Sequence, residues 1–93
     1  MKIALDPEAI DDLIGIYRWI AQDSPAAARA VVERLLDSIE HLGSFPNMGR
    51  IGRDEATREW PVPRLPYIVV YEVAAERDEL LVLAIFHGAQ ERR

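Results

Sequence analysis

Two apolar runs near the end of the chain form its clearest pattern. Residues 67–74 alternate imperfectly between apolar and polar side chains, whereas residues 80–86 are apolar at every position. A charged corner, residues 75–79, joins the two runs, so the pattern predicts a β-hairpin. A strand without a polar face must be covered on both sides. We therefore expect residues 80–86 to form the central strand of a sheet.

Upstream of this hairpin, the apolar positions follow a helical spacing in two segments. Asp6 followed by Pro7, and Ser24 followed by Pro25, are typical helix starts, because the polar side chain caps the helix and proline fits its first turn. Gly43 is expected to end the second helix. Because the junction between the segments is short, they are predicted to form an antiparallel helical hairpin. The two apolar stripes consist of Ile10, Leu13, Ile14, Tyr17, Ile20 and Ala21, and of Ala28, Val31, Leu35, Ile39 and Leu42.

Four further apolar residues widen these stripes or fall beside them. Ile16 and Trp19 lie off the stripe of the first helix, and Val32 and Leu36 broaden the stripe of the second. Residues three or four positions apart are neighbours on a helix surface, so each pair adds apolar surface at one place. Such surface either packs into the core or marks an interface with another protein.

The remaining segments complete the predicted sheet. Residues 1–5 are expected to form an edge strand, and residues 57–62 resemble a strand that Pro61 keeps short. Residues 44–56 are rich in turn-forming residues and are expected to be irregular. The element order predicts one α+β domain with two layers, a β-α-α-β-β-β chain in which an α-helical hairpin packs on a mainly antiparallel four-stranded sheet. Its expected parts are the helical hairpin at 6–43, the sheet at 57–88 and a polar tail at 89–93.

Composition narrows the function classes. The 93-residue chain carries a net charge of −5 and contains no cysteine. An acidic protein has no general attraction for nucleic acid, and a chain without cysteine has no disulfide framework or thiolate site. The sequence shows no membrane span or signal segment, and no spacing typical of metal ligands or phosphate-binding loops. We therefore expect a cytoplasmic protein that uses no membrane, metal or cofactor.

An arginine-rich stretch is the main candidate for chemistry. Four arginines fall between residues 50 and 64, and together with Tyr67, His87, Arg92 and Arg93 they could converge at one end of the sheet. Arginine binds phosphate through paired hydrogen bonds, and a metal-free ribonuclease needs such groups together with an acid and a base. Acidic residues interleave with the arginines, so a solvated loop of mutually paired charges is the alternative. The four arginines are Arg50, Arg53, Arg58 and Arg64.

Two other polar features have structural interpretations. Asp11 and Asp12 fall away from the apolar stripe of the first helix and are interpreted as a solvated face. His87 follows a strand that we expect to be buried, so its default role is structural.

Several segments, in this order along the chain, resemble the RelE/ParE superfamily of bacterial toxins from type II toxin–antitoxin systems. The resemblance covers nearly the whole chain and agrees with the predicted element order. It implies a small cytoplasmic toxin that is neutralised by a cognate antitoxin protein. The segments that carry it are PNMGR at 46–50, TRE at 57–59, PYIVVYEV at 66–73 and LAIFHGAQERR at 83–93.

The resemblance implies one of two activities. The RelE-like branch cleaves mRNA on the ribosome and places an arginine where this chain has Ile68. That branch often ends in a pair of ionisable or aromatic residues, whereas this chain has His87 followed by Gly88. The ending looks more like the ParE-like branch, whose members inhibit DNA gyrase by binding it. For that activity, the candidate target-binding residues are Arg50, Arg53, His87, Arg92 and Arg93.

Two alternatives remain open at this point. In the first, the protein is a ribosome-dependent mRNA endonuclease that uses Arg58, Arg64, Tyr67 and His87. In the second, it is a non-toxic member of the family that only binds its antitoxin. The resemblance implies an antitoxin segment that covers the helical hairpin and a sheet edge. A second copy of the toxin is the alternative cover, and the candidate contacts are Ile16, Trp19, Val32 and Leu36.

Overall fold

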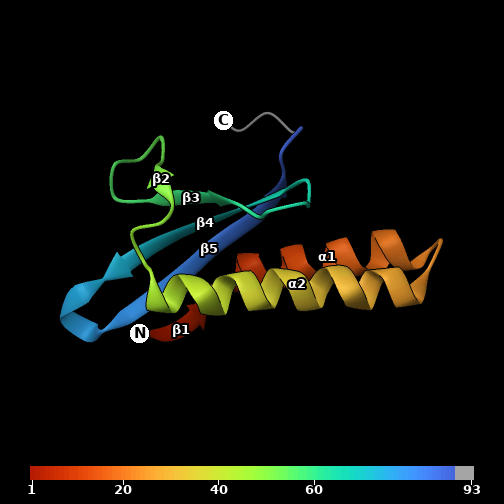
Figure 1. Ribbon diagram of the computed structural model, residues 1–93, viewed down its shortest axis with the longest axis horizontal. Helices are drawn as coiled ribbons and strands as arrows, with labels where there is room; N and C mark the ends of the chain where they lie inside the picture. The colour runs from red at the N-terminus through yellow and green to blue at the C-terminus, as the bar shows by residue number, and fades with distance from the viewer. Residues whose placement is uncertain (90–93) are drawn as a thin grey trace.

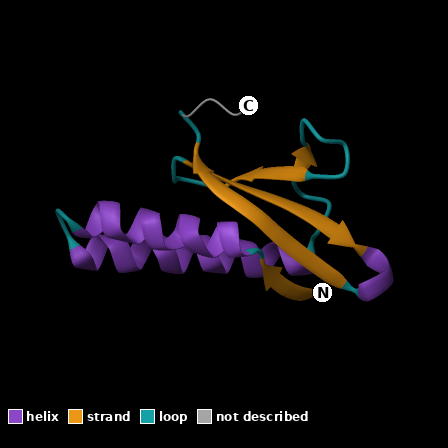
Figure 2. Ribbon diagram, turned by 180° about the vertical axis from the view of Figure 1, so that it is seen from behind, coloured by secondary structure: helices purple, strands orange, loops and turns teal. Residues whose placement is uncertain are grey.

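The protein has two layers, a helical hairpin and a sheet. A computed structural model describes residues 1–89. The helices lie together on one side of the sheet, as the two opposite views show (Figure 1, Figure 2). The elements are β1 (Lys2–Leu5), α1 (Pro7–Ala21), α2 (Pro25–Ser44), β2 (Arg50–Ile51), β3 (Arg58–Pro61), β4 (Tyr67–Ala74), the 3₁₀ turn η1 (Ala75–Arg77) and β5 (Glu79–His87).

The sheet has five strands in the order β1-β5-β4-β3-β2. β1 runs parallel to β5, and the other neighbours are antiparallel. The predicted α+β fold with a helical hairpin on a mainly antiparallel sheet is confirmed, but the strand count is five instead of four. The additional strand, β2, lies in the stretch expected to be irregular, because two residues are too few to produce a recognisable pattern.

Both helix starts are those that the sequence predicts. The Asp6 carboxylate accepts a hydrogen bond from the backbone N–H of Glu8 at 3.1 Å, and the Ser24 hydroxyl accepts one from Ala27 at 3.1 Å. Each interaction satisfies a backbone donor that has no partner inside the helix. The capping residues therefore fix where α1 and α2 begin.

Gly43 differs from its predicted role. It lies inside α2, which ends one residue later at Ser44, and no glycine in residues 1–89 has a positive φ angle. A Cβ atom at Gly43 would lie 2.9 Å from the end of the Ile3 side chain and 3.3 Å from the Met1 carbonyl oxygen. The amino group of Met1 also donates to the Gly43 carbonyl at 3.2 Å. The glycine therefore makes room for β1 and does not cap the helix.

The core lies between the hairpin and the sheet. The largest side chains that are fully buried come from α2, β4 and β5, and they are Leu35, Leu42, Val69, Tyr71, Leu80 and Val82. The opposite face of the sheet is covered less completely, since Leu81, Ala84 and Phe86 stay half-buried. The expectation that β5 is covered on both sides is therefore wrong for this face. The strand in the middle of the sheet is β4, and β5 lies between β4 and β1.

Candidate functional site

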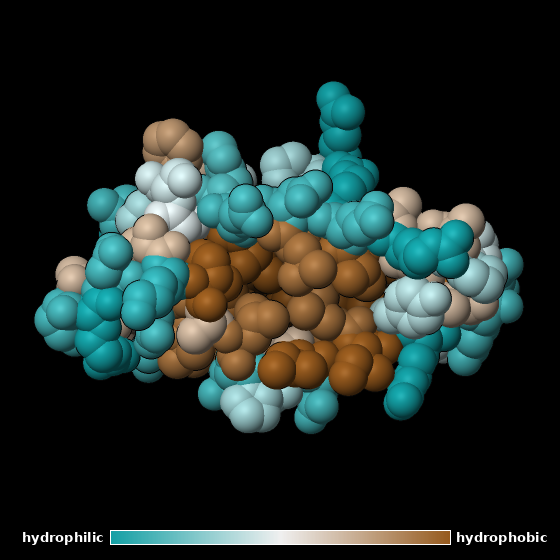
Figure 3. Space-filling model, turned by 90° about the horizontal axis from the view of Figure 1, so that it is seen from below, coloured by the Kyte–Doolittle hydropathy of each residue, from teal (hydrophilic) through white to brown (hydrophobic). Residues whose placement is uncertain are grey.

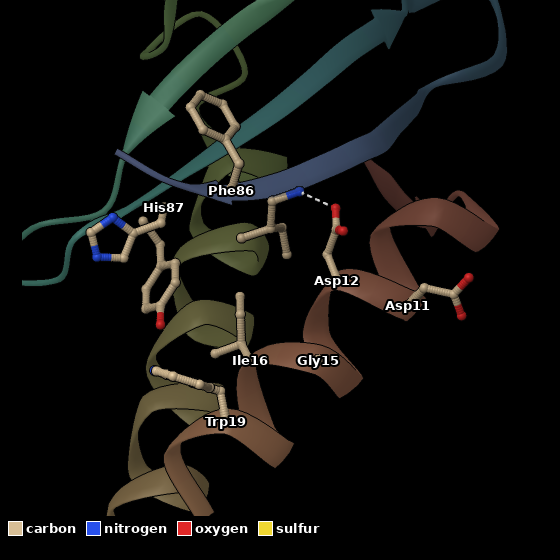
Figure 4. A pocket seen from close by; sticks show the side chains of 9 residues that line it. Asp11, Asp12, Gly15, Ile16, Trp19, Phe86 and His87 are labelled. Carbon is tan, nitrogen blue, oxygen red and sulfur yellow. Dashed lines mark hydrogen bonds between the residues drawn. The ribbon is translucent and has the colours of Figure 1, made fainter. Parts of the chain in front are cut away.

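A cleft opens where the flank of α1 meets the last residues of β5. Its volume is about 380 Å³, and we call it the α1–β5 cleft (Figure 4). The side chains that line it come from α1 and from the hairpin of β4 and β5. They are Asp11, Asp12, Gly15, Ile16, Trp19, Tyr67, Ile85, Phe86 and His87.

The end of β1 creates this cleft. β1 pairs with β5 only as far as Val82, so the later residues of β5 have no strand beside them on that edge. The carboxylate of Asp12 accepts a hydrogen bond from the backbone N–H of Ile85 at 2.8 Å, which satisfies a donor that a strand would otherwise pair (Figure 4). The helix thus replaces the missing strand with a side chain and leaves space beside it.

Aromatic rings line the cleft from both the strands and α1. Tyr67 and His87 are directly opposite each other on β4 and β5, and their rings meet edge to face with centroids 5.6 Å apart. Trp19 is 71% exposed. Figure 4 shows Trp19 and Ile16 on the side of α1 where His87 lies, whereas Asp12 points to β5 and Asp11 points away.

The sequence interpretation missed the part that Asp12 plays. Asp11 and Asp12 were both assigned to a solvated face, yet Asp12 is half-buried and bonded to β5. A signal was present: Asp12, Ile16 and Trp19 are spaced four and three residues apart, so they lie on one side of the helix. A carboxylate at the edge of an apolar pair indicates a polar contact at the core boundary.

Of the four candidate nuclease residues, Arg58 lies apart from the other three. Arg58 begins β3, whereas Arg64 lies beyond the other end of β3 in an exposed turn, with a φ angle of 67°. Tyr67 and His87 lie near Arg64, because the backbone N–H of Gly88 donates to Pro66 in the same turn. The structure therefore divides these residues between the two ends of β3.

Arg58 is held by hydrogen bonds to the backbone. One guanidinium nitrogen donates to the carbonyl of Gly49 at 2.7 Å and to that of Asn47 at 3.3 Å. The Tyr71 hydroxyl donates to the Pro46 carbonyl at 2.7 Å and accepts from the Gly49 N–H at 2.9 Å. Arg58 and Tyr71 together fix the connection that leads from α2 to β2.

Tyr71 is fully buried in this network. Burial raises the pKa of its phenol above the ordinary value of 10.0, while the Gly49 hydrogen bond and the charge of Arg58 oppose that shift. The phenol is therefore a permanent hydrogen-bond donor at neutral pH. Gly49 must be glycine here, since a Cβ atom would lie 2.6 Å from the Tyr71 oxygen.

The remaining candidate arginines lie at the β2 end of the sheet. Arg50 forms an exposed ion pair with Glu59 at 3.5 Å, and such a pair adds little stability. Arg53 is exposed in the loop between β2 and β3. Arg92 and Arg93 lie outside the described residues.

The four candidate antitoxin contacts fall on two different surfaces. Ile16 and Trp19 line the α1–β5 cleft, whereas Val32 and Leu36 do not. Leu36 and Gly43 are seven residues apart and so lie on one side of α2, next to Ile3 of β1. Val32 and Leu36 therefore belong to the side of the hairpin that faces away from the cleft.

This outer side of the hairpin carries a broad apolar surface. Figure 3 shows hydrophobic side chains gathered on the face that the helices and β1 present, with polar side chains around them. Four large apolar residues of these elements are between 37% and 44% exposed. We call this surface the outer hairpin face and define it by Ile3, Ile10, Ile14 and Leu36, with Val32 half-buried beside them.

Comparison with known proteins identifies the family. The model of the ParE toxin of the type II toxin–antitoxin system parDE matches residues 3–92 of this chain. The chain belongs to the ParE toxin family. This family assignment confirms the resemblance to the RelE/ParE superfamily that the sequence motifs indicate, and it makes the protein a type II toxin–antitoxin toxin.

Individual relatives and solved structures agree with this assignment. Y4kP of Sinorhizobium fredii is 35% identical over 86% of this chain and 78% of its own length. Toxin RelE2 of Caulobacter vibrioides is 34% identical over 88% of this chain and 89% of its own. A structure of the chromosomal ParDE system from P. aeruginosa superposes with a TM-score of 0.81 at 21% identity, covering 94% of this chain and 95% of that one. The toxin fold of this ParE-family chain is therefore shared with ParDE.

The described part of the chain lacks two kinds of site. No helix within residues 1–89 is long and apolar enough to cross a membrane. Over the same residues, no group of three or more His, Asp or Glu side chains is placed to hold a metal ion.

Proposed function

We propose that this ParE-family toxin acts by binding DNA gyrase and does not cut RNA. The observation that carries the proposal is the position of Arg58, the candidate phosphate ligand of a nuclease. Its guanidinium donates to the carbonyl oxygens of Gly49 and Asn47. Because these bonds hold the α2–β2 connection, Arg58 has a role in the fold, and this supports the proposal.

The other nuclease candidates support the same proposal. A nuclease of this superfamily is expected to have an arginine at the position of Ile68, and isoleucine cannot bind a phosphate. Arg64 lies at the opposite end of β3 from Arg58, so the two guanidiniums cannot clamp one phosphate. The net charge of −5 also opposes the approach of RNA.

Binding a protein target requires fewer precisely placed side chains than cutting RNA does. It requires an accessible surface and no converging acid, base and phosphate ligands. Arg50 and Arg53 are exposed at the β2 end of the sheet and are our candidates for the gyrase contact, together with His87.

Two assays with the purified toxin test this proposal. We expect micromolar toxin to inhibit supercoiling by purified gyrase, and the cognate antitoxin to abolish that inhibition. Arg53→Glu should weaken inhibition severalfold because it reverses an exposed charge in the contact. The matched change Arg29→Glu, at an exposed position of α2, should leave inhibition unchanged.

Primer extension on translated mRNA tests the alternative, in which the toxin is an endonuclease. Toxin-dependent cuts, together with gyrase that stays fully active at micromolar excess of toxin, would refute the proposal. If Arg64→Glu then reduced cutting and Arg53→Glu did not, the endonuclease alternative would replace it.

The outer hairpin face is the surface that we assign to the antitoxin. It is apolar and accessible, with Ile10, Ile14 and Leu36 spread across both helices. An amphipathic helix of a partner binds such a surface by laying its own apolar side against it. In this proposal, the antitoxin neutralises the toxin by covering the outer hairpin face.

A further inference from the structure

The α1–β5 cleft lies apart from the outer hairpin face and has a different chemical character. From its geometry we infer that the cleft binds the arginine side chain of a partner polypeptide. The inference does not depend on whether the toxin acts on gyrase, because binding at the cleft can be measured directly.

The cleft contains unfilled space along the helix. A Cβ atom placed on Gly15 would have no other atom within 4 Å, so the surface between Asp12 and Trp19 is open. The volume of about 380 Å³ is at the lower end of the range for small-molecule sites. A single long side chain therefore fits it better than a folded domain does.

The charge of the lining selects a cation. Asp11 and Asp12 both line the cleft, and no lysine or arginine of residues 1–89 is among its lining residues. Neither carboxylate forms a salt bridge within residues 1–89. Asp12 uses one oxygen to accept from Ile85, and a carboxylate has further lone pairs that can accept a guanidinium.

The two carboxylates have different parts in the site. Figure 4 shows Asp12 directed at β5, with Ile16 between it and Trp19 along α1, whereas Asp11 points away. Asp12 is therefore the direct acceptor, and Asp11 adds negative charge at the rim. The same charges repel a phosphate, which excludes nucleic acid as the occupant.

The rings and the aliphatic residues favour arginine among the cations. The indole of Trp19 is 71% exposed and presents a ring face on which a planar guanidinium can stack. Ile16 and Ile85 line the same space and offer contact to the methylene groups of a long side chain. A compact, strongly hydrated ammonium group makes poorer use of a flat ring.

Titration with a small probe tests the inference. We expect N-acetyl-argininamide to bind the full-length toxin with a dissociation constant on the order of millimolar, shifting the NMR signals of the Trp19 indole and the Ile85 amide. N-acetyl-citrullinamide has nearly the same shape without the charge, and should bind at least tenfold more weakly. Raising the salt concentration from 50 to 500 mM should weaken arginine binding severalfold, since exposed charges are screened.

Variants separate the cleft from the rest of the surface. Asp12→Asn keeps an oxygen that can accept from Ile85, yet should weaken arginine binding about tenfold. Gly15→Leu fills the open space and should abolish binding, whereas Ala30→Leu, on an exposed position of α2, should not change it. Circular dichroism confirms that each variant is folded.

Three results would overturn the inference. Citrulline binding as strongly as arginine would remove the role of charge. Shifts that spare Trp19 and Ile85 would place the probe elsewhere. Full arginine affinity in a folded Asp12→Asn or Gly15→Leu variant would show that the cleft is not the site.

Discussion

Tyr71 is the residue that connects the core to the first irregular segment. Its ring is buried between α2 and the sheet, and its hydroxyl bonds to Pro46 and Gly49. A single side chain thus satisfies one acceptor and one donor in a connection that has no strand partner of its own.

Tyr71→Phe should lower the free energy of unfolding by about 1–3 kcal/mol, because it leaves the Gly49 N–H and the Pro46 carbonyl without partners. Tyr17→Phe is the matched control, since the Tyr17 hydroxyl makes no hydrogen bond within residues 1–89, and should change stability by about 0.5 kcal/mol or less. Denaturant unfolding of both variants measures the difference. Equal effects at the two positions would contradict this role for Tyr71.

The same pair of variants has a pH dependence with a definite sign. The native fold raises the pKa of Tyr71 above 10.0 through burial, so it binds the phenolic proton more tightly than the unfolded chain does. This contribution to stability is complete below pH 10 and is lost as the pH rises through the raised pKa. The stability advantage of the wild type over Tyr71→Phe should therefore shrink above pH 10.

At the scale of the elements, two glycines in the helical hairpin have opposite surroundings. Gly15 of α1 faces open space, whereas Gly43 of α2 faces Ile3 and the Met1 carbonyl of β1. Alanine is the better helix former by about 1 kcal/mol when nothing obstructs its methyl group. Replacing glycine by alanine should therefore increase stability at Gly15 and not at Gly43.

Gly15→Ala should raise the melting temperature by about 4–8 °C, which corresponds to about 1 kcal/mol in a domain of this size. Gly43→Ala should give no gain or a loss, because its methyl group displaces Ile3 and strains the contact with Met1. Thermal unfolding of the two variants under one buffer condition makes the comparison. A similar increase in melting temperature at both positions would show that β1 shifts to accommodate the methyl group without loss of stability.

The sequence predicts those elements whose signal is local. The capping residues Asp6 and Ser24 locate the helix starts, and the apolar run at 80–86 locates β5. β2 was missed because two residues carry no periodicity, and Gly43 was misassigned because a glycine near a helix end usually caps it. The contact that gives Gly43 its role comes from β1, forty residues away.

The candidate site was harder to predict for a related reason. Which arginines converge depends on the strand order, and β3 separates Arg58 from Arg64 by its whole length. The α1–β5 cleft exists because β1 stops pairing at Val82, and a strand's end point relative to its neighbour is not encoded in local spacing. The spacing of Asp12 relative to Ile16 and Trp19 is the one feature of the cleft that the sequence indicates.

At the scale of the whole molecule, the protein presents two surfaces of different chemistry. The outer hairpin face is apolar, and the α1–β5 cleft is acidic and aromatic. Their separation allows one partner to cover the hairpin without closing the cleft. Our two proposals therefore place the antitoxin and a second polypeptide on different parts of the toxin.

Leu36→Asp should weaken binding of the cognate antitoxin by at least tenfold, since it places a charge in the apolar contact and removes the burial of a leucine. Because Leu36 is 42% exposed, the free toxin should remain folded. Ala30→Asp adds the same charge to an exposed position on another side of α2 and should bind normally. Isothermal titration with the antitoxin decides this, and equal affinities for both variants would remove the outer hairpin face from the interface.

The parallel pairing of β1 with β5 has a consequence for synthesis of the toxin. Lys2 pairs with Glu79 and Leu5 with Val82, so the first strand made on the ribosome waits for the last one before it can join the sheet. Until β5 is made, the helical hairpin can cover only an incomplete sheet. A product that ends before β5 therefore lacks both the partner strand of β1 and the backbone donor that Asp12 bonds to.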